Sequence, residues 1–174
     1  ESSRWYPGAG LYRNVHLVIT EDAYVPTWGT YVTTPVVTDE CAKVCVKTSW
    51  VTPKGADKDN YRIVTEIKDG TGRVVATGES RLSVYDKGVF EQEFAVAHPE
   101  LWSPESPVLY TAESKVYEGN VQKDAYTTRF GIRTLEIVPD KGFFLNGKMT
   151  KFKGVCNHHD LGPLGGAVNM AAIR

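Results

Sequence analysis

The feature that most constrains this chain is the strict alternation of apolar and polar residues within short segments. Residues 42–51 are the clearest case, because every second position carries a core-type side chain: Val44, Val46, Thr48 and Trp50. Successive side chains of a strand point to opposite faces of a sheet, so this period of two predicts strands with one buried face. A helix would need an apolar repeat of 3.6 residues, and the sequence offers no convincing one.

The same pattern recurs along the chain between turn residues. Strands are expected at residues 12–19, 31–37, 42–51, 61–67, 73–76, 88–96, 108–117, 121–129 and 132–138. Pro35 has no N–H to donate, so residues 31–37 are expected at a sheet edge. About seven strands between residues 30 and 137 are typical of an all-β, antiparallel immunoglobulin-like or fibronectin-like sandwich. This domain is expected at residues 23–138, and a jelly roll or barrel is the alternative.

The charge balance excludes some classes of partner. The 174 residues include 20 Lys+Arg and 21 Asp+Glu, for a net charge of −1, without a block of like charge. Nucleic acids and anionic membranes require concentrated positive charge, so neither is expected as a partner. The longest apolar runs are also far shorter than a membrane span.

The three cysteines are predicted to be free and mostly buried thiols. Cys41 and Cys45 fall on one face of a single strand, too far apart for an unstrained disulfide. The count of three also leaves at least one thiol, such as Cys156, without a partner. A zinc site would need more ligands at closer spacing. No metal and no cofactor is expected.

The character of the chain changes after Pro139. Asn146-Gly147 is a strong hairpin signal, residues 149–155 have a strand pattern, and residues 169–174 have the composition of a beginning helix. A strand, a loop and a helix start make half of a βα unit, which cannot bury its apolar surface alone. Residues 139–174 are therefore expected to begin an α/β domain, and residues 1–22 to end a preceding one.

Four stretches carry a resemblance to a known family, in the order in which that family has them. They are residues 3–15 (SRWYPGAGLYRNV), 101–110 (LWSPESPVLY), 130–133 (FGIR), and 142–148 (GFFLNGK) with 153–160 (KGVCNHHD). Together they resemble glycoside hydrolase family 2. The resemblance implies the end of a sugar-binding jelly roll, an immunoglobulin-like sandwich, and the start of a (β/α)8 catalytic barrel.

The resemblance also implies the activity of a longer parent enzyme. Residues 157–162 (NHHDLG) are closest in style to the β-galactosidase branch, so the parent is expected to hydrolyse terminal β-galactosides with retention. β-Glucuronidase and β-mannosidase parents are the alternatives. Enzymes of this kind use two glutamates about 5 Å apart on later barrel strands. The last glutamate here is Glu136, in the predicted sandwich, so the chain is expected to hold no catalytic residue and to be inactive alone.

By the same resemblance, His158 matches a histidine that follows the first barrel strand and hydrogen-bonds sugar hydroxyls. A neutral imidazole donates to one hydroxyl and accepts from another, so His158 is the predicted substrate-binding residue, with a packing histidine as the alternative. His159 and Asp160 suggest a metal site, but adjacent strand side chains point in opposite directions, so structural hydrogen bonds are expected instead. Asn157 is expected to shape the loop.

Three other positions have two interpretations each. Arg133 is either a salt-bridge residue that orients domains or an exposed strand arginine. Trp102 is expected to cap the sandwich core, with a sugar-stacking platform as the alternative. Trp5 and Tyr6 are expected to pack at a domain interface rather than stack on sugar.

Other functions compete with that of an enzyme segment. A free-standing module that binds carbohydrate or protein would need an exposed aromatic platform on the sandwich, whereas a structural spacer would need only flanking domains. The expected partners are a β-galactoside or related glycan, reached through the parent, and neighbouring domains of the same polypeptide. Residues 141–174 are expected to expose apolar surface in the isolated chain, and then to fray, to pack back on the sandwich or to pair with a second copy. The residues that motivate this are Phe143, Phe144, Leu145, Met149, Phe152 and Val155. A periplasmic or secreted parent is expected.

Overall fold

The computed structural model describes residues 14–81, 88–156 and 171, which belong to two units. The larger unit spans Thr20–Lys151. The second combines Glu1–Ile19 with Phe152–Arg174. Among the described residues, no helix is long and apolar enough to span a membrane.

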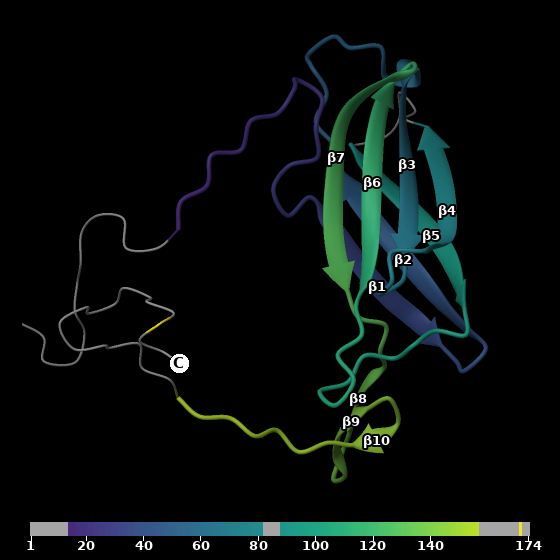
Figure 1. Cartoon of the computed structure of the whole chain (residues 1–174), viewed down its shortest axis with the longest axis vertical. Coiled ribbons are helices and arrows are strands. Elements are labelled where there is room, and N and C mark those ends of the chain that lie inside the picture. The colour runs from purple at the N-terminus through teal and green to yellow at the C-terminus, as the bar shows by residue number, and fades with distance from the viewer. Residues whose placement is uncertain (1–13, 82–87, 157–170, 172–174) are drawn as a thin grey trace, which may run out of the picture. The chain divides into compact units, whose positions relative to one another are not determined.

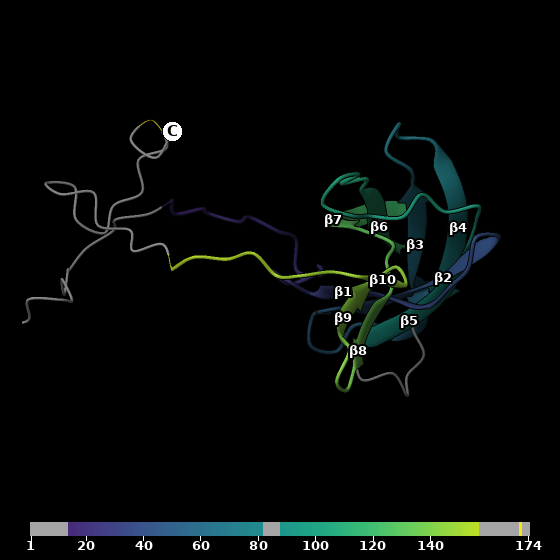
Figure 2. The same cartoon turned by 90° about the horizontal axis from the view of Figure 1, so that it is seen from below.

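Seven strands of the larger unit form a β-sandwich (Figure 1). They are β1 (Thr30–Val37), β2 (Cys41–Ser49), β3 (Tyr61–Lys68), β4 (Val74–Arg81), β5 (Val89–Ala97), β6 (Tyr110–Glu118) and β7 (Val121–Phe130). One antiparallel sheet has the order β1-β2-β5, and the facing sheet has the order β4-β3-β6-β7 (Figure 2). A short 3₁₀ helix, η1 (Lys58–Asn60), precedes β3. The predicted all-β sandwich class is therefore confirmed.

The alternation in the sequence explains the central strand of the smaller sheet. Val44, Val46 and Thr48 of β2 are fully buried, while the residues between them point outward. β1 lies at the edge of this sheet, as Pro35 predicted. The pairing of β1 with β2 shifts between Thr33 and Val36, because Pro35 interrupts the ladder and produces a bulge.

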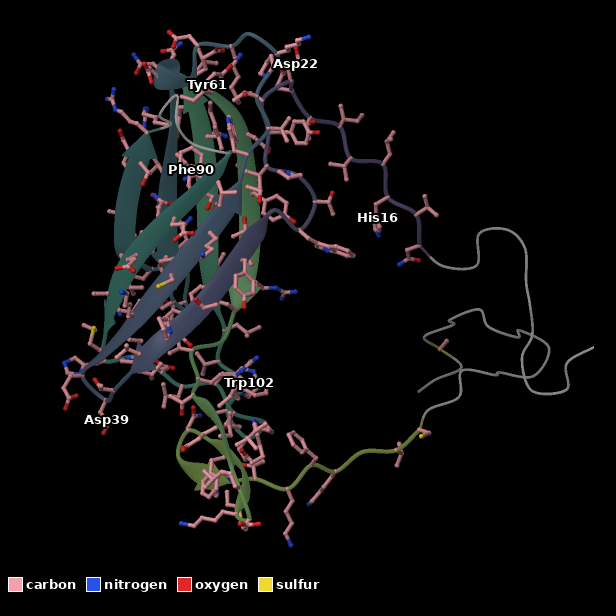
Figure 3. All side chains as sticks on the ribbon, turned by 180° about the vertical axis from the view of Figure 1, so that it is seen from behind. His16, Asp22, Asp39, Tyr61, Phe90 and Trp102 are labelled. Carbon is pink, nitrogen blue, oxygen red and sulfur yellow. The ribbon has the colours of Figure 1, made fainter. Side chains whose placement is uncertain are left out.

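The core of the sandwich contains two apolar clusters separated by a polar layer. One cluster includes Val44, Ile67 and Ile132, and the other includes Tyr61, Phe90 and Val116. Figure 3 shows Tyr61 and Phe90 toward one end of the sandwich and Trp102 toward the other. Between the clusters lie four buried polar residues, one from each of four strands: Thr48, Thr65, Gln92 and Ser114.

The polar layer is held by a chain of side-chain hydrogen bonds. The Thr65 hydroxyl donates to Gln92 Oε1 at 2.7 Å and lies 2.9 Å from the Ser114 hydroxyl. Because Thr65 has one hydroxyl hydrogen and gives it to Gln92, Ser114 must be the donor to Thr65. The buried Thr48 hydroxyl has no hydrogen-bond partner in the described part of the chain.

The outer faces of both sheets carry ion pairs. Lys43 and Lys47 on β2 contact Glu93 and Glu91 on β5, with N–O distances of 2.7 and 2.6 Å. On the other sheet, Lys68, Glu66, Glu113 and Lys115 form a network, in which the hydrogen bond from Lys68 holds the pKa of Glu113 below its ordinary value. Charged pairs of this kind keep the sheet faces solvated and add little stability each.

A third, smaller sheet follows the sandwich. It consists of β8 (Leu135–Val138), β9 (Gly142–Leu145) and β10 (Lys148–Met149), in the antiparallel order β10-β9-β8. Asn146 and Gly147 connect β9 to β10 with φ angles of 50° and 72°, which is the left-handed backbone that an Asn-Gly hairpin requires. The hairpin predicted at these two residues is confirmed.

Two predicted strands are wrong. Residues 14–20 form no strand, and Val15, Leu17 and Ile19 are largely exposed. The strand expected at residues 149–155 ends at Met149, and residues 151–156 are exposed. An apolar pattern alone does not form a strand, because a strand also needs its backbone groups paired in a ladder. The helix start expected at residues 169–174 lies outside the described residues, apart from Ala171.

Candidate functional site at the junction of the sandwich and the small sheet

Three connections meet where the small sheet leaves the sandwich. The first is the β5–β6 connection, which contains Trp102; the second is the β7–β8 connection, residues 131–134; the third is the β9–β10 turn at Asn146. Figure 3 shows Trp102 at this end of the sandwich. The three connections are joined by hydrogen bonds, so the junction is a defined structure rather than a loose linker.

Asn146 is the centre of the junction. Its side-chain amide donates to the Trp102 carbonyl at 3.0 Å, and its Oδ1 accepts from the Thr134 N–H at 3.0 Å. Its own backbone N–H donates to the Thr134 carbonyl at 3.0 Å. Because one residue satisfies groups from both other connections, the small sheet is fixed to the end of the sandwich.

Trp102 packs against the β7–β8 connection. Its backbone N–H donates to the Ile132 carbonyl at 2.8 Å. A Cβ atom added to Gly131 would lie 2.7 Å from Trp102 Cβ and 2.8 Å from Trp102 Cγ, which is closer than real contacts allow. Glycine is therefore needed at position 131 for the indole to approach the backbone.

The position of Arg133 contradicts one of its two interpretations, the exposed strand arginine, whereas a salt bridge that orients domains stays a prediction. It is half-buried and lies between β7 and β8, so it is not an exposed strand arginine. Its guanidinium lies 5.0 Å from the centre of the Trp102 ring, a cation–π contact, and no salt bridge of Arg133 occurs within the described residues. The Arg133 carbonyl also accepts from the Thr34 hydroxyl at 3.1 Å, which ties the junction to β1. The Trp102 ring, half-buried under Arg133, is not a free sugar platform.

The small sheet exposes apolar side chains, unlike the charged outer faces of the sandwich. Leu135, Ile137 and Met149 are 58%, 81% and 54% exposed. Of the apolar residues noted beyond position 141, Met149, Phe152 and Val155 are exposed, as expected, whereas Phe143 and Phe144 are half-buried and Leu145 is buried. A fixed element with exposed aliphatic groups is suited to docking, because covering them removes apolar surface from water.

Several predicted site residues cannot be placed in this geometry. His158, His159, Asp160 and Asn157 lie outside the described residues, as do Trp5 and Tyr6. Across residues 14–81, 88–156 and 171, no three His, Cys, Asp or Glu side chains form a group that could hold a metal ion. The three cysteines are free, as predicted, but Cys41 and Cys45 are half-buried and Cys156 is exposed, so the prediction of mostly buried thiols was wrong.

Sequence reasoning missed the role of Asn146. The Asn-Gly pair predicted the turn, but the partners of the side chain lie 12 and 44 residues away and leave no local pattern. The sequence signal for this role is that position 146 is an asparagine and not a glycine. Glycine also adopts a left-handed backbone, whereas asparagine brings an amide that can bond to other segments.

The sandwich is an immunoglobulin-like domain, and the junction connects it to the small sheet of β8, β9 and β10. Residues 24–133 match the family model described as glycosyl hydrolases family 2. The chain is 43% identical to the β-galactosidase BoGH2A of Bacteroides ovatus over 99% of its own length and 20% of that protein. It is 34% identical to a β-glucuronidase of Bacteroides fragilis, over 91% of this chain and 24% of that one.

Solved structures agree with this assignment. A glycosyl hydrolase family 2 member from Bacteroides cellulosilyticus matches 97% of this chain with a TM-score of 0.86 and 35% identity, over 22% of that protein. The chain therefore belongs to glycosyl hydrolase family 2. It spans about a fifth of the length of the relatives it matches.

Proposed function

We propose that this chain is a scaffolding segment of a retaining β-glycosidase that hydrolyses terminal β-galactosides. The observation that carries the proposal is the 43% identity to a β-galactosidase over 99% of this chain. The segment corresponds to only 20% of that protein, so the remaining length is available for catalysis. In this role the chain supplies no acid/base and no nucleophile.

The junction supports the scaffolding role. Asn146 fixes the small sheet to the sandwich through Trp102 and Thr134, and the small sheet presents Leu135 and Ile137 to solvent. In the parent enzyme, a neighbouring domain of the same polypeptide covers these side chains. We also propose that domain boundaries lie at residues 22–23 and 138–139, on either side of the sandwich. His158, at the start of the barrel, is proposed to contact the sugar.

The test is a comparison of two polypeptides on two substrates. This chain and a longer polypeptide that includes the complete barrel are each assayed with a chromogenic β-galactoside and a chromogenic β-glucuronide. We expect hydrolysis of the galactoside by the longer polypeptide alone. Turnover by this chain alone would overturn the scaffolding role. If the longer polypeptide prefers the glucuronide, the parent is a β-glucuronidase instead. The 34% identity to the β-glucuronidase of B. fragilis supports this alternative.

A second experiment tests His158 in the longer polypeptide. His158→Ala removes both hydrogen-bonding nitrogens, and we expect kcat/KM to fall by about 10- to 1000-fold, because a lost buried hydrogen bond in the transition state costs a few kcal/mol. Asn157→Ala, next to it, measures for comparison what a change in the shape of the same loop costs. Equal activity of His158→Ala and the unmodified enzyme would assign this histidine to packing.

A further inference from the structure

Trp28 stands in a backbone conformation that tryptophan rarely adopts. Its φ is 60°, in the left-handed region, where a bulky side chain is an outlier. The conformation is held by a tight turn, in which the Gly29 N–H donates to the Pro26 carbonyl at 2.7 Å. The backbone N–H of Trp28 is fixed as well, because it donates to the Tyr126 hydroxyl at 2.9 Å.

This strained turn displays the indole instead of burying it. Of the three described tryptophans, Trp50 is buried, Trp102 is half-buried and Trp28 is 90% exposed. The backbone conformation at position 28 favours glycine, so the turn would be more stable without the tryptophan side chain. The stability of the fold therefore does not explain why a tryptophan stands there. Strained residues held by surrounding structure are a recognised mark of functional positions.

The indole borders an open hollow of about 490 Å³ between β1 and β7. The hollow is lined by Trp28, Thr30, Leu109, Tyr126, Thr127, Thr128 and Arg129. Thr127 and Arg129 are exposed on β7, and their side chains, together with the Tyr126 hydroxyl, supply hydrogen-bonding groups beside the indole. The Tyr126 hydroxyl accepts from Trp28, so its own hydrogen can be donated to a ligand.

This chemistry favours a glycan over a protein domain. A docked domain covers aliphatic groups, as on the small sheet, whereas Leu109 is the one aliphatic residue that lines this hollow. A sugar ring combines an apolar C–H face, which packs on an indole, with a rim of hydroxyls that bond to threonine and arginine. The hollow has no acidic lining residue, so a carboxylated sugar would also be accepted next to Arg129.

We propose that Trp28 and the adjoining hollow on β7 form a non-catalytic glycan-binding site on the sandwich. One sugar ring stacks on the exposed indole, and the neighbouring rings bond to Thr127 and Arg129, which are exposed on the same face of β7. The site is separate from the hydrolytic function proposed above, and it would place a glycan chain on the scaffold itself.

The experiment follows the indole N–H signals of this chain by NMR during titration with two probes. One probe is neutral, a β-1,4-galactotetraose, and the other is acidic, a tetrasaccharide of alternating glucuronic acid and N-acetylglucosamine. We expect a saturable shift of the Trp28 signal, with the buried Trp50 signal unchanged as an internal reference. A larger response to the acidic probe, lost in Arg129→Gln, would assign the guanidinium to a sugar carboxylate.

The key variant is Trp28→Gly, with affinity measured by calorimetry. Glycine suits the left-handed backbone, so this variant should melt no lower than the wild type, and lost binding cannot be attributed to misfolding. We expect at least about a tenfold loss of affinity, as for other aromatic anchors. Tyr31→Ala, which removes another exposed aromatic outside the hollow, should bind like the wild type.

Three results would overturn the site. They are no saturable shift with either probe, full affinity in Trp28→Gly, or a Trp28 signal that responds only to the rest of the parent polypeptide. The last would make the surface a domain contact. Failure of the hydrolysis assay in the longer polypeptide would leave these binding measurements unaffected.

Discussion

The side-chain amide of Asn146 donates a 3.0 Å hydrogen bond to the carbonyl of Trp102, 44 residues earlier in the chain. The same side chain accepts from the Thr134 N–H. A residue chosen by local turn chemistry therefore also sets a long-range relationship, the placement of the small sheet on the sandwich. The scaffolding proposal depends on this placement, because a docking element must be held in one orientation.

Substitution of Asn146 separates the turn from the hydrogen bonds. Asn146→Gly keeps the left-handed backbone but removes two side-chain hydrogen bonds, so we expect a loss of about 1–3 kcal/mol. Asn146→Ala keeps a Cβ at positive φ but loses the tolerance that asparagine has for this backbone, so we expect a larger loss than for glycine, about 2–4 kcal/mol. Urea unfolding measures both, and hydrogen exchange should quicken at the Thr134 amide.

The control for Asn146 is Asn120→Ala in the β6–β7 turn. Asn120 is exposed, so this change should stay within about 0.5 kcal/mol of the wild type. An Asn146→Gly variant as stable as Asn120→Ala would refute the role of the amide.

The polar layer predicts opposite effects for two threonines. Thr65→Val removes the link between Gln92 and Ser114 and leaves their buried groups unpaired, so we expect destabilisation by about 1–3 kcal/mol. Thr48→Val removes a buried hydroxyl without a partner among the described residues, so it should be neutral or stabilise by about 1 kcal/mol. Both variants conserve volume. Equal losses in the two would show that Thr48 has a bonding partner, such as a buried water.

Gly131 should tolerate no side chain. Gly131→Ala places a Cβ 2.7 Å from Trp102 Cβ, and the forced shift should cost about 1–3 kcal/mol. Gly70→Ala is the matched control, because its Cβ would meet nothing nearer than 3.7 Å. Thermal melting of the two variants is sufficient, and a Gly131→Ala variant that melts with Gly70→Ala would show that the indole can move.

Asp69 should contribute to acid stability in a defined direction. The Thr71 hydroxyl, above all, together with the N–H groups of Thr71 and Arg73, lowers the pKa of Asp69 from 3.8 to about 2. A carboxylate with a lowered folded-state pKa stabilises the fold above its unfolded pKa. This contribution is therefore complete at neutral pH and is lost as the pH falls from about 3.8 to about 2.

Two variants check this direction. Thr71→Val should raise the pKa of Asp69 measured by NMR titration, and Asp69→Asn should flatten the stability profile within that pH window. An unchanged Asp69 titration in Thr71→Val would assign the lowered pKa to another cause.

The sequence alone predicted the sandwich because its strands have two-residue periodicity and each strand pairs within this chain. The edge position of β1 could also be predicted, since Pro35 removes a donor whatever the surroundings. Residues 14–20 and 150–156 have apolar patterns of the same kind, yet form no strand. The two-residue periodicity of a segment predicts which face of a strand would be buried. Whether the strand forms depends on pairing with another strand, which the local pattern does not show.

The junction was predictable only in part. Trp102 and Arg133 were singled out, but their contact with each other depends on the approach that Gly131 allows. The exposure of Trp28 and its left-handed φ could not be predicted, because both are properties of the folded chain. Such relationships join residues far apart in sequence and have no signature in a single stretch.

The most direct test of the account is hydrogen exchange at β8 and β10, measured in this chain and in the longer polypeptide that includes the barrel. If the small sheet is a docking element, its amides should exchange at least about tenfold more slowly in the longer polypeptide, while those of β2 stay unchanged. Equal exchange of β8 and β10 in both polypeptides would contradict the scaffolding role, because no neighbouring domain would then cover Leu135 and Ile137.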